Sequence, residues 1–261
     1  MAAHRLACGL GLRVWKGSGS AHRTVVIAGA LGVKQRFYEK YAAHVSSEGL
    51  NAVTFDYVGV GESKPEGYEH ATLDDWATNQ DDVLGYASDE FDKPITLVGH
   101  SIGAQFLGTL ARRGRVDRLL TISSMNNELR HQRQNGLALQ AFWKVGVPAL
   151  CSAFGRFPAK SLGLFEDVPS AVMLGWRRWV LEGSPWHDGK TPAPGSVASL
   201  SFGDDEYGDL AAVRSFHDAV FGDATTYLRP DIVGVGHHGF FKERHASLWR
   251  DVHGWVDPVE A

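Results

Sequence analysis

Short apolar runs alternate with longer amphipathic stretches along the chain. The runs are four to six residues long and occupy residues 24–28, 52–55, 95–98, 119–122, 197–202 and 225–228. Runs of this length suit strands that are buried on both faces, and the stretches between them can hold helical crossovers. The pattern therefore predicts an α/β fold with a mostly parallel central sheet flanked by helices.

Several of the intervening stretches have the spacing of helices. Residues 37–45 repeat apolar side chains at helical intervals. A second helix has a start signal, because Thr72 is followed three positions later by Asp75. Residues 213–220 and 248–255 indicate later helices.

Residues 125–195 interrupt this rhythm and show no clean strand. We interpret them as an inserted, mainly helical cap, with residues 1–124 and 196–261 as the two parts of one core. The cap is rich in aromatic residues, namely Trp143, Trp176, Trp179, Trp186, Phe142, Phe154, Phe157 and Phe165. These side chains either receive an apolar acyl or aromatic group of a substrate or form the core of the cap itself.

Composition narrows the class of protein. The 261 residues are 44% hydrophobic and 21% charged, which is typical of a globular protein. The net charge of −4 argues against a nucleic-acid partner. Cys8 and Cys151 cannot form a disulfide framework or a metal cluster, so we expect a cytoplasmic protein. No window approaches the roughly 20 apolar residues of a membrane span, and the apolar run at 6–12 is short for a secretory signal.

A candidate nucleophile lies in the pattern Gly-His-Ser-Ile-Gly at residues 99–103. A serine on a sharp turn between a strand and a helix needs small residues two positions before and after it, and Gly99 and Gly103 provide them. Residues 101–110 are predicted to form the helix, whose amino end would favour developing negative charge. Ser101 is therefore the predicted nucleophile, and a glycine-rich turn with an idle serine is the alternative.

Together with this motif, residues 56–63 resemble the Asp-x-x-Gly-x-Gly-x-Ser loop of the α/β-hydrolase superfamily. A dinucleotide-binding loop is excluded because Lys64 stands where the third glycine would be needed. The resemblance runs from about Thr24 to the C-terminus and implies the α/β-hydrolase fold. The cap and residues 236–241 are further similar to uncharacterised predicted serine hydrolases, often described as serine-aminopeptidase-like or lysophospholipase-like, a description that implies no particular substrate.

A serine hydroxyl needs a base to take its proton and an acid to orient that base. In the family these follow the serine in the order acid, then histidine. The resemblance implies an acid just beyond the strand at 197–202, where Asp205 is preferred and Asp204 is the alternative. It places the histidine at a Gly-His step in a late loop, which points to His237, with His238 as the alternative.

The family's oxyanion hole uses two backbone amides. One belongs to the residue after the nucleophile, which is Ile102. The other comes from the loop after the first central strand, where Ala30 is preferred and Leu31 is the alternative. Many relatives have His-Gly where this chain has Ala28 and Gly29, so a local side-chain hydrogen bond is lost while the backbone amide remains.

These residues predict hydrolysis of a carboxylic ester of a small molecule through an acyl-enzyme, with no metal or other cofactor. A serine at residue 101 argues against the haloalkane dehalogenases and epoxide hydrolases, which attack with aspartate. An amidase or peptidase, a thioesterase and an acyltransferase would use the same triad. A ligand-binding member of the fold without activity is the alternative outside enzymes.

Overall fold

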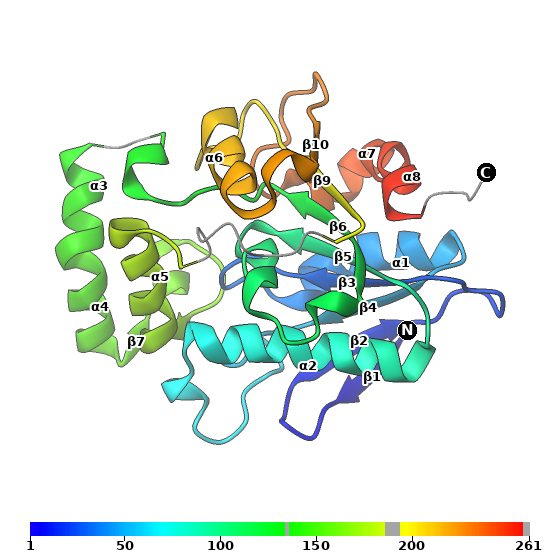
Figure 1. Ribbon diagram of the computed structural model, residues 1–261. Helices are drawn as coiled ribbons and strands as arrows, with labels where there is room; N and C mark the ends of the chain where they lie inside the picture. Colours follow the sequence, from blue (N-terminus) through cyan, green and yellow to red (C-terminus); the bar gives the residue numbers. More distant parts are fainter. Residues whose placement is uncertain (134–135, 186–193, 258–261) are drawn as a thin grey trace.

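The computed structural model describes residues 1–133, 136–185 and 194–257. Its centre is an eight-stranded sheet with the order β1-β2-β4-β3-β5-β6-β9-β10 (Figure 1). The strands are β1 (Ala2–Arg5), β2 (Gly11–Trp15), β3 (Thr24–Ala28), β4 (Asn51–Phe55), β5 (Ile95–His100), β6 (Val116–Ile122), β9 (Ser196–Leu200) and β10 (Thr225–Leu228). The first two strands pair antiparallel, as do β2 and β4, and every other pairing in this sheet is parallel. The predicted mostly parallel sheet is confirmed.

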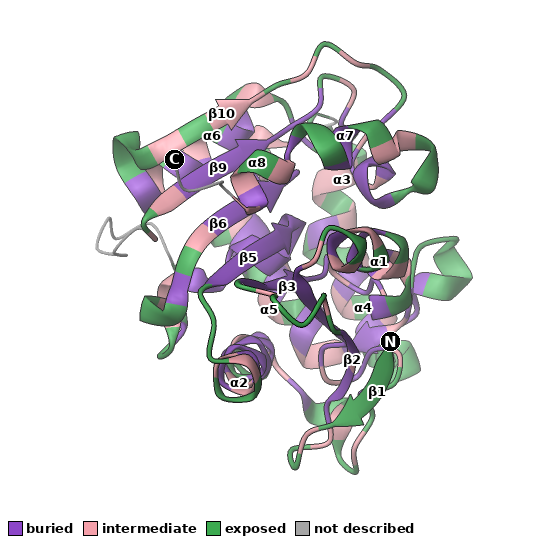
Figure 2. Cartoon of the chain, turned by 90° about the vertical axis from the view of Figure 1, so that its right-hand side faces the viewer, coloured by how far each residue is buried: buried purple, intermediate pink, exposed green. Residues whose placement is uncertain are grey.

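Helices cover both faces of the sheet. Alternate side chains of each strand point to opposite faces, so the residues that they contact show which helices lie on each face. Val25 of β3 lies in the cluster that includes Tyr41 and Trp249, whereas Val26 lies in the cluster that includes Trp76. One face therefore carries helices α1 (Glu39–Ser47), α7 (Ala246–Asp251) and α8 (His253–Val256), and the other carries α2 (Leu73–Phe91) and α6 (Leu210–Phe221). Figure 2 shows α1 and α2 on opposite sides of the buried strands.

The start signal of α2 is confirmed in atomic detail. The Thr72 hydroxyl accepts a hydrogen bond from the Asp75 amide at 3.2 Å, and the Asp75 carboxylate accepts one from the Thr72 amide at 2.8 Å. This reciprocal pair satisfies amides that would otherwise be free in the first turn. Short 3₁₀-helices elsewhere are η1 (Gln35–Tyr38), η2 (Tyr68–His70), η5 (Arg113–Arg115), η6 (Leu129–His131), η8 (Ala159–Leu162), η9 (Gly222–Ala224), η10 (Gly239–Phe241) and η11 (Glu243–His245).

The helix predicted after Ser101 is wrong as an α-helix. The chain instead forms two 3₁₀-helices, η3 (Ser101–Ala104) and η4 (Leu107–Thr109), with bonds such as Gln105 N–H to the Ile102 carbonyl at 2.8 Å. Glycines at 103 and 108 and the β-branched Thr109 have low helix propensity, which favours these tighter single turns. The amino end behind Ser101 therefore has no long α-helical dipole.

The segment between β6 and β9, which we call the cap segment (residues 125–195), is mainly helical and lies at the left of Figure 1. Its elements are α3 (Leu137–Ala141), a π-helical stretch η7 (Phe142–Gly146), α4 (Val147–Phe154), the short strands β7 (Arg156–Phe157) and β8 (Val168–Pro169), and α5 (Ser170–Glu182). Trp143, Trp176, Trp179 and Phe157 are buried in the same cluster as Trp76. These four aromatic residues are therefore core, and Trp186 lies outside the described residues.

One helical stretch of the cap segment is notable for its apolar character. Leu137–Phe154 is long and apolar enough, by length and composition, to cross a membrane, and only 17% of it is buried. The prediction that no window approaches a membrane span overlooked this stretch, because Gln140, Lys144 and Ser152 interrupt its apolar residues. One stretch of this kind is weak evidence for a membrane span.

Candidate active site

Ser101 lies in a strained backbone turn at the carboxyl end of β5. Its φ angle is +54°, and Asp92 and Ser123 are the other described non-glycine residues with positive φ. A Cβ on Gly103 would lie 2.3 Å from the Ala28 carbonyl oxygen, and a Cβ on Gly99 would lie 2.6 Å from the Ala104 Cα. The two glycines are required here by close backbone contact, which is the reason that the sequence motif carries meaning.

The predicted acid and base meet in the fold. His237 Nδ1 lies 2.9 Å from Asp205 Oδ2, and only 5% of His237 and 2% of Asp205 are exposed. Because an ionised carboxylate only accepts hydrogen bonds, Nδ1–H is the donor. The Tyr207 amide donates to the other oxygen of Asp205 at 2.9 Å, which fixes the carboxylate. In a neutral imidazole that donates from Nδ1, Nε2 is the nitrogen that can accept a proton.

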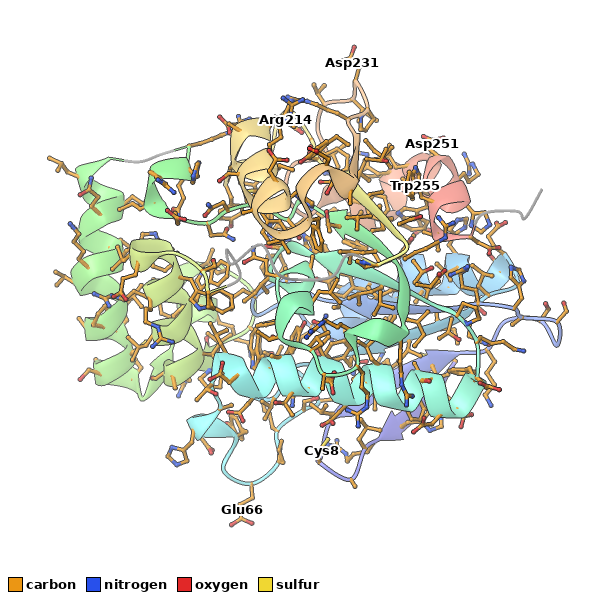
Figure 3. The ribbon with its side chains drawn as sticks, viewed as in Figure 1. Cys8, Glu66, Arg214, Asp231, Asp251 and Trp255 are labelled. Carbon is orange, nitrogen blue, oxygen red and sulfur yellow. The ribbon has the colours of Figure 1, made fainter. Side chains whose placement is uncertain are left out.

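Asp204 and Glu206, on either side of Asp205, hold the histidine loop by its backbone. The Asp204 carboxylate accepts hydrogen bonds from the amides of Gly234 at 2.6 Å and Gly236 at 3.1 Å. Burial raises the pKa of Asp204, but these hydrogen bonds outweigh it, so the pKa is lowered overall. Glu206 accepts from the His237 amide at 3.0 Å. Asp231, at the outer tip of the same loop, is labelled in Figure 3.

His100, the residue inside the serine motif, links three parts of the site. Its Nε2–H donates to the His237 carbonyl at 2.9 Å, and its Nδ1 accepts from the Tyr38 hydroxyl at 2.9 Å. Tyr38 in turn accepts from the Ala30 amide at 2.8 Å. Burial, together with the nearby His237 and His238, holds the pKa of His100 well below its usual value. A neutral His100 is the form that this chain of hydrogen bonds requires.

The Tyr38 bond bears on the predicted oxyanion hole. The Ala30 amide, which was the preferred donor beside Ile102, is already engaged by the Tyr38 hydroxyl. Leu31, the alternative, follows directly in the same turn after β3. Ile102 follows Ser101 at the start of η3. Amides in the first turn of a helix have no carbonyl acceptor within that helix.

His238 differs from His237 in its surroundings. Its ring lies 4.6 Å from the Phe165 ring and 6.2 Å from the Phe37 ring, measured between centroids. Burial, reinforced by the neighbouring His237, lowers the pKa of His238 to about 3. In the part of the chain that is described, its Nδ1 is buried without a hydrogen-bond partner, so no carboxylate orients this ring.

Among the described residues, no hydrogen bond joins the Ser101 hydroxyl to His237. Such bonds are often long in unliganded enzymes and tighten when substrate binds. The described residues also contain no group of three or more His, Cys, Asp or Glu side chains that could hold a metal ion.

Three of the candidate residues follow the carboxyl ends of parallel strands in one sheet, because Ala30 follows β3, Ser101 follows β5 and Asp205 follows β9. Residues 24–198 match the sequence pattern described as the alpha/beta hydrolase family. The chain belongs to the alpha/beta hydrolase family. No curated protein matches the sequence.

Solved structures resemble this alpha/beta hydrolase over nearly its whole length. A soluble variant of monoglyceride lipase from Saccharomyces cerevisiae has a TM-score of 0.72 at 12% identity, covering 98% of this chain and 94% of that one. Monoacylglycerol lipase from Paleococcus ferrophilus has a TM-score of 0.66 at 14% identity, with 98% of each chain covered. Alpha/beta hydrolase domain-containing protein 10 from mouse has a TM-score of 0.68 at 17% identity, with 100% of each covered. At these identities the likeness shows the fold.

Sequence reasoning missed Tyr38, the linking role of His100, and Ser124, whose hydroxyl donates to the Ser101 carbonyl at 2.6 Å. Tyr38 lies within a stretch that reads as an ordinary amphipathic helix. Ser124 lies two residues after the end of β6, where no sequence motif marks it. No local pattern marks these residues, because their partners are distant in the sequence.

Proposed function

We propose that this hydrolase is a serine hydrolase that cleaves carboxylic esters through Ser101, His237 and Asp205. The observation that carries the proposal is the buried hydrogen bond between His237 and Asp205. Asp205 and the strained Ser101 turn both lie beyond the carboxyl ends of parallel strands. The bond favours Asp205 over Asp204 as the acid, and the lack of a partner carboxylate at His238 favours His237 as the base.

The mechanism is acyl transfer to water. Ser101 attacks the ester carbonyl while His237 Nε2 takes the hydroxyl proton, and His237 then gives this proton to the leaving alcohol. Water then attacks the acyl-enzyme while His237 Nε2 takes one of its protons, and His237 returns this proton to the Ser101 oxygen as the carboxylic acid is released. Asp205 holds the tautomer of His237 and stabilises the imidazolium that forms.

Backbone amides stabilise the oxyanion in this proposal. Ile102 supplies one amide, and the turn after β3 supplies the other from Ala30 or Leu31. The hydrogen bond between Ala30 and Tyr38 favours Leu31 as long as Tyr38 keeps its place. Loss of one such donor lowers kcat by about 10²–10³.

The proposed substrate is a small-molecule ester with an apolar acyl or aromatic group, and in this proposal the cap segment covers the bound substrate. Phe165 of the cap segment supports this, because it is 38% exposed and stands against His238. Two of the similar structures are named as lipases of monoglycerides, which agrees with an apolar acyl ester. An amidase or peptidase, a thioesterase and an acyltransferase are the alternatives that share the triad, and a ligand-binding protein is the non-enzyme alternative.

The test uses purified protein and a chain-length series of p-nitrophenyl esters, matched thioesters and anilides. Wild type should turn over the esters fastest, and Ser101→Ala should lose this activity while its thermal unfolding stays unchanged. Faster turnover of thioesters or anilides would replace the ester assignment, and an active Ser101→Ala would refute the serine mechanism. His237→Ala against His238→Ala separates the two histidines.

A further inference from the structure

A short part of the cap segment crosses to the turn after β3 that holds the candidate oxyanion amides. The Glu166 amide donates a hydrogen bond to the Gly32 carbonyl at 2.9 Å. Gly32 has a φ of +69°, and a Cβ there would lie 2.9 Å from the Glu166 carbonyl oxygen. The two backbones are therefore in direct contact, only one residue away from Leu31.

The Glu166 side chain adds a charged link at the same place. Only 5% of Glu166 is exposed, and its Oε2 lies 3.0 Å from Lys34 Nζ, while Oε1 pairs with Lys160. Burial raises the pKa of Glu166, but the hydrogen bonds and charges of the two lysines outweigh it and lower the pKa overall. A buried, ionised carboxylate of the cap segment thus joins a lysine of the turn after β3 to a lysine of the cap segment.

The neighbouring residue extends this contact to the other side of the site. The Phe165 ring lies 4.6 Å from the His238 ring and 6.0 Å from the Phe37 ring, measured between centroids. One stretch of two residues therefore touches the turn after β3 through Glu166 and the histidine loop through Phe165. The position of the cap segment and the position of the oxyanion amides are mechanically linked.

We propose that Glu166 is a positioning residue. Through Lys34 it fixes the turn at residues 30–34, so that the backbone amide of Ala30 or Leu31 in this turn faces the oxyanion. The inference rests on the proposed ester hydrolysis at Ser101. The donors of an oxyanion hole act through their placement, and an error of about 1 Å in a catalytic group can cost about 10²-fold in rate. Glu166 does not touch substrate, so its effect should fall on kcat and not on KM.

The chain supplies a matched pair of lysines for the test. Lys34→Met removes the partner on the turn after β3, whereas Lys160→Met removes the partner within the cap segment and leaves the link to the turn intact. Glu166→Gln removes the charge at nearly constant shape. Each variant is assayed with p-nitrophenyl butyrate and with butylboronic acid, whose adduct with Ser101 mimics the oxyanion.

We expect Glu166→Gln and Lys34→Met each to lower kcat by about tenfold or more, with KM within about threefold of wild type, because they displace one oxyanion donor. Affinity for the boronic acid should fall in parallel, and Lys160→Met should stay within about twofold of wild type for both quantities. The double variant Lys34→Met/Glu166→Gln should be no worse than the poorer single variant, since both changes break one link. Lys34→Arg should recover most of the activity.

Two results would overturn the inference. One is a loss for Lys160→Met as large as that for Lys34→Met. The other is a drop in thermal stability of Glu166→Gln and Lys34→Met without any change in kcat or boronic-acid affinity. If the proposed function itself is wrong, Ser101→Ala will retain activity. If only the positioning role is wrong, Ser101→Ala will be inactive while the Glu166 and Lys34 variants match wild type.

Discussion

Replacement of Asp205 by asparagine tests the assignment of the acid without a change of shape. His237 Nδ1 and Asp205 Oδ2 are 2.9 Å apart, and both residues are at most 5% exposed, so water cannot substitute for the carboxylate. An amide nitrogen at this position would donate to Nδ1 and place the imidazole proton on Nε2. His237 would then face Ser101 with a proton and could not act as a base.

This change of tautomer sets the expected loss in kcat. The same substitution in serine protease triads lowers kcat by about 10⁴, which corresponds to about 5.5 kcal/mol of transition-state stabilisation. Asp204→Asn is the matched control, because the amide oxygen can still accept a hydrogen bond from the Gly234 or Gly236 amide. We expect Asp204→Asn to stay within about tenfold of wild type.

The assay is kcat/KM for p-nitrophenyl butyrate between pH 6 and 9, with thermal unfolding of each variant as the control for folding. The reasoning is refuted if Asp205→Asn keeps more than about a tenth of wild-type activity, or if Asp204→Asn is the more damaged variant.

Three further predictions concern buried groups near the site and in the core. His100→Leu should lower kcat by about tenfold or more, because the Tyr38 hydroxyl and the His237 carbonyl lose their hydrogen-bond partner. Steady-state kinetics measures this loss, and thermal unfolding is the control for folding. Burial lowers the pKa of His217 from 6.5 to about 4, so the unfolded chain takes up its proton first as pH falls. The stability that depends on neutral His217 is complete above pH 6.5 and declines by about 3 kcal/mol toward pH 4, so urea unfolding of His217→Gln should show a shallower decline than wild type. Gly61→Ala should destabilise the fold by about 2 kcal/mol or more, since its Cβ would lie 2.2 Å from Asp56 Oδ2, whereas Gly67→Ala, with a similar positive φ but open space, should cost about 1 kcal/mol in the same assay.

The parallel strands could be predicted because burial on both faces leaves an apolar run in the sequence. The strand predicted at 24–28 coincides with β3, and the one at 95–98 lies within β5, and both of these strands are fully buried. Strand β1 could not be predicted from an apolar run, because all four of its residues are exposed. The α-helix predicted after Ser101 was wrong because apolar spacing does not distinguish a helix from successive 3₁₀ turns that bury the same side chains.

The candidate site divides along similar lines. Ser101 could be predicted because the two glycines around it answer a local steric need. Asp204 and Asp205 are adjacent, so the sequence cannot tell which carboxylate turns toward the imidazole, and the fold separates them by their hydrogen bonds. Tyr38 and Glu166 act through contacts with residues far along the chain, and no local pattern predicts such contacts.

Covalent labelling by a fluorophosphonate probe, read by intact mass and peptide mapping, tests the central claim most directly. We predict one adduct per wild-type chain, located on Ser101, none on Ser101→Ala, and labelling of His237→Ala slowed by at least about 10³-fold because the base is lost. An adduct on another residue, or equal labelling of Ser101→Ala, would contradict the account.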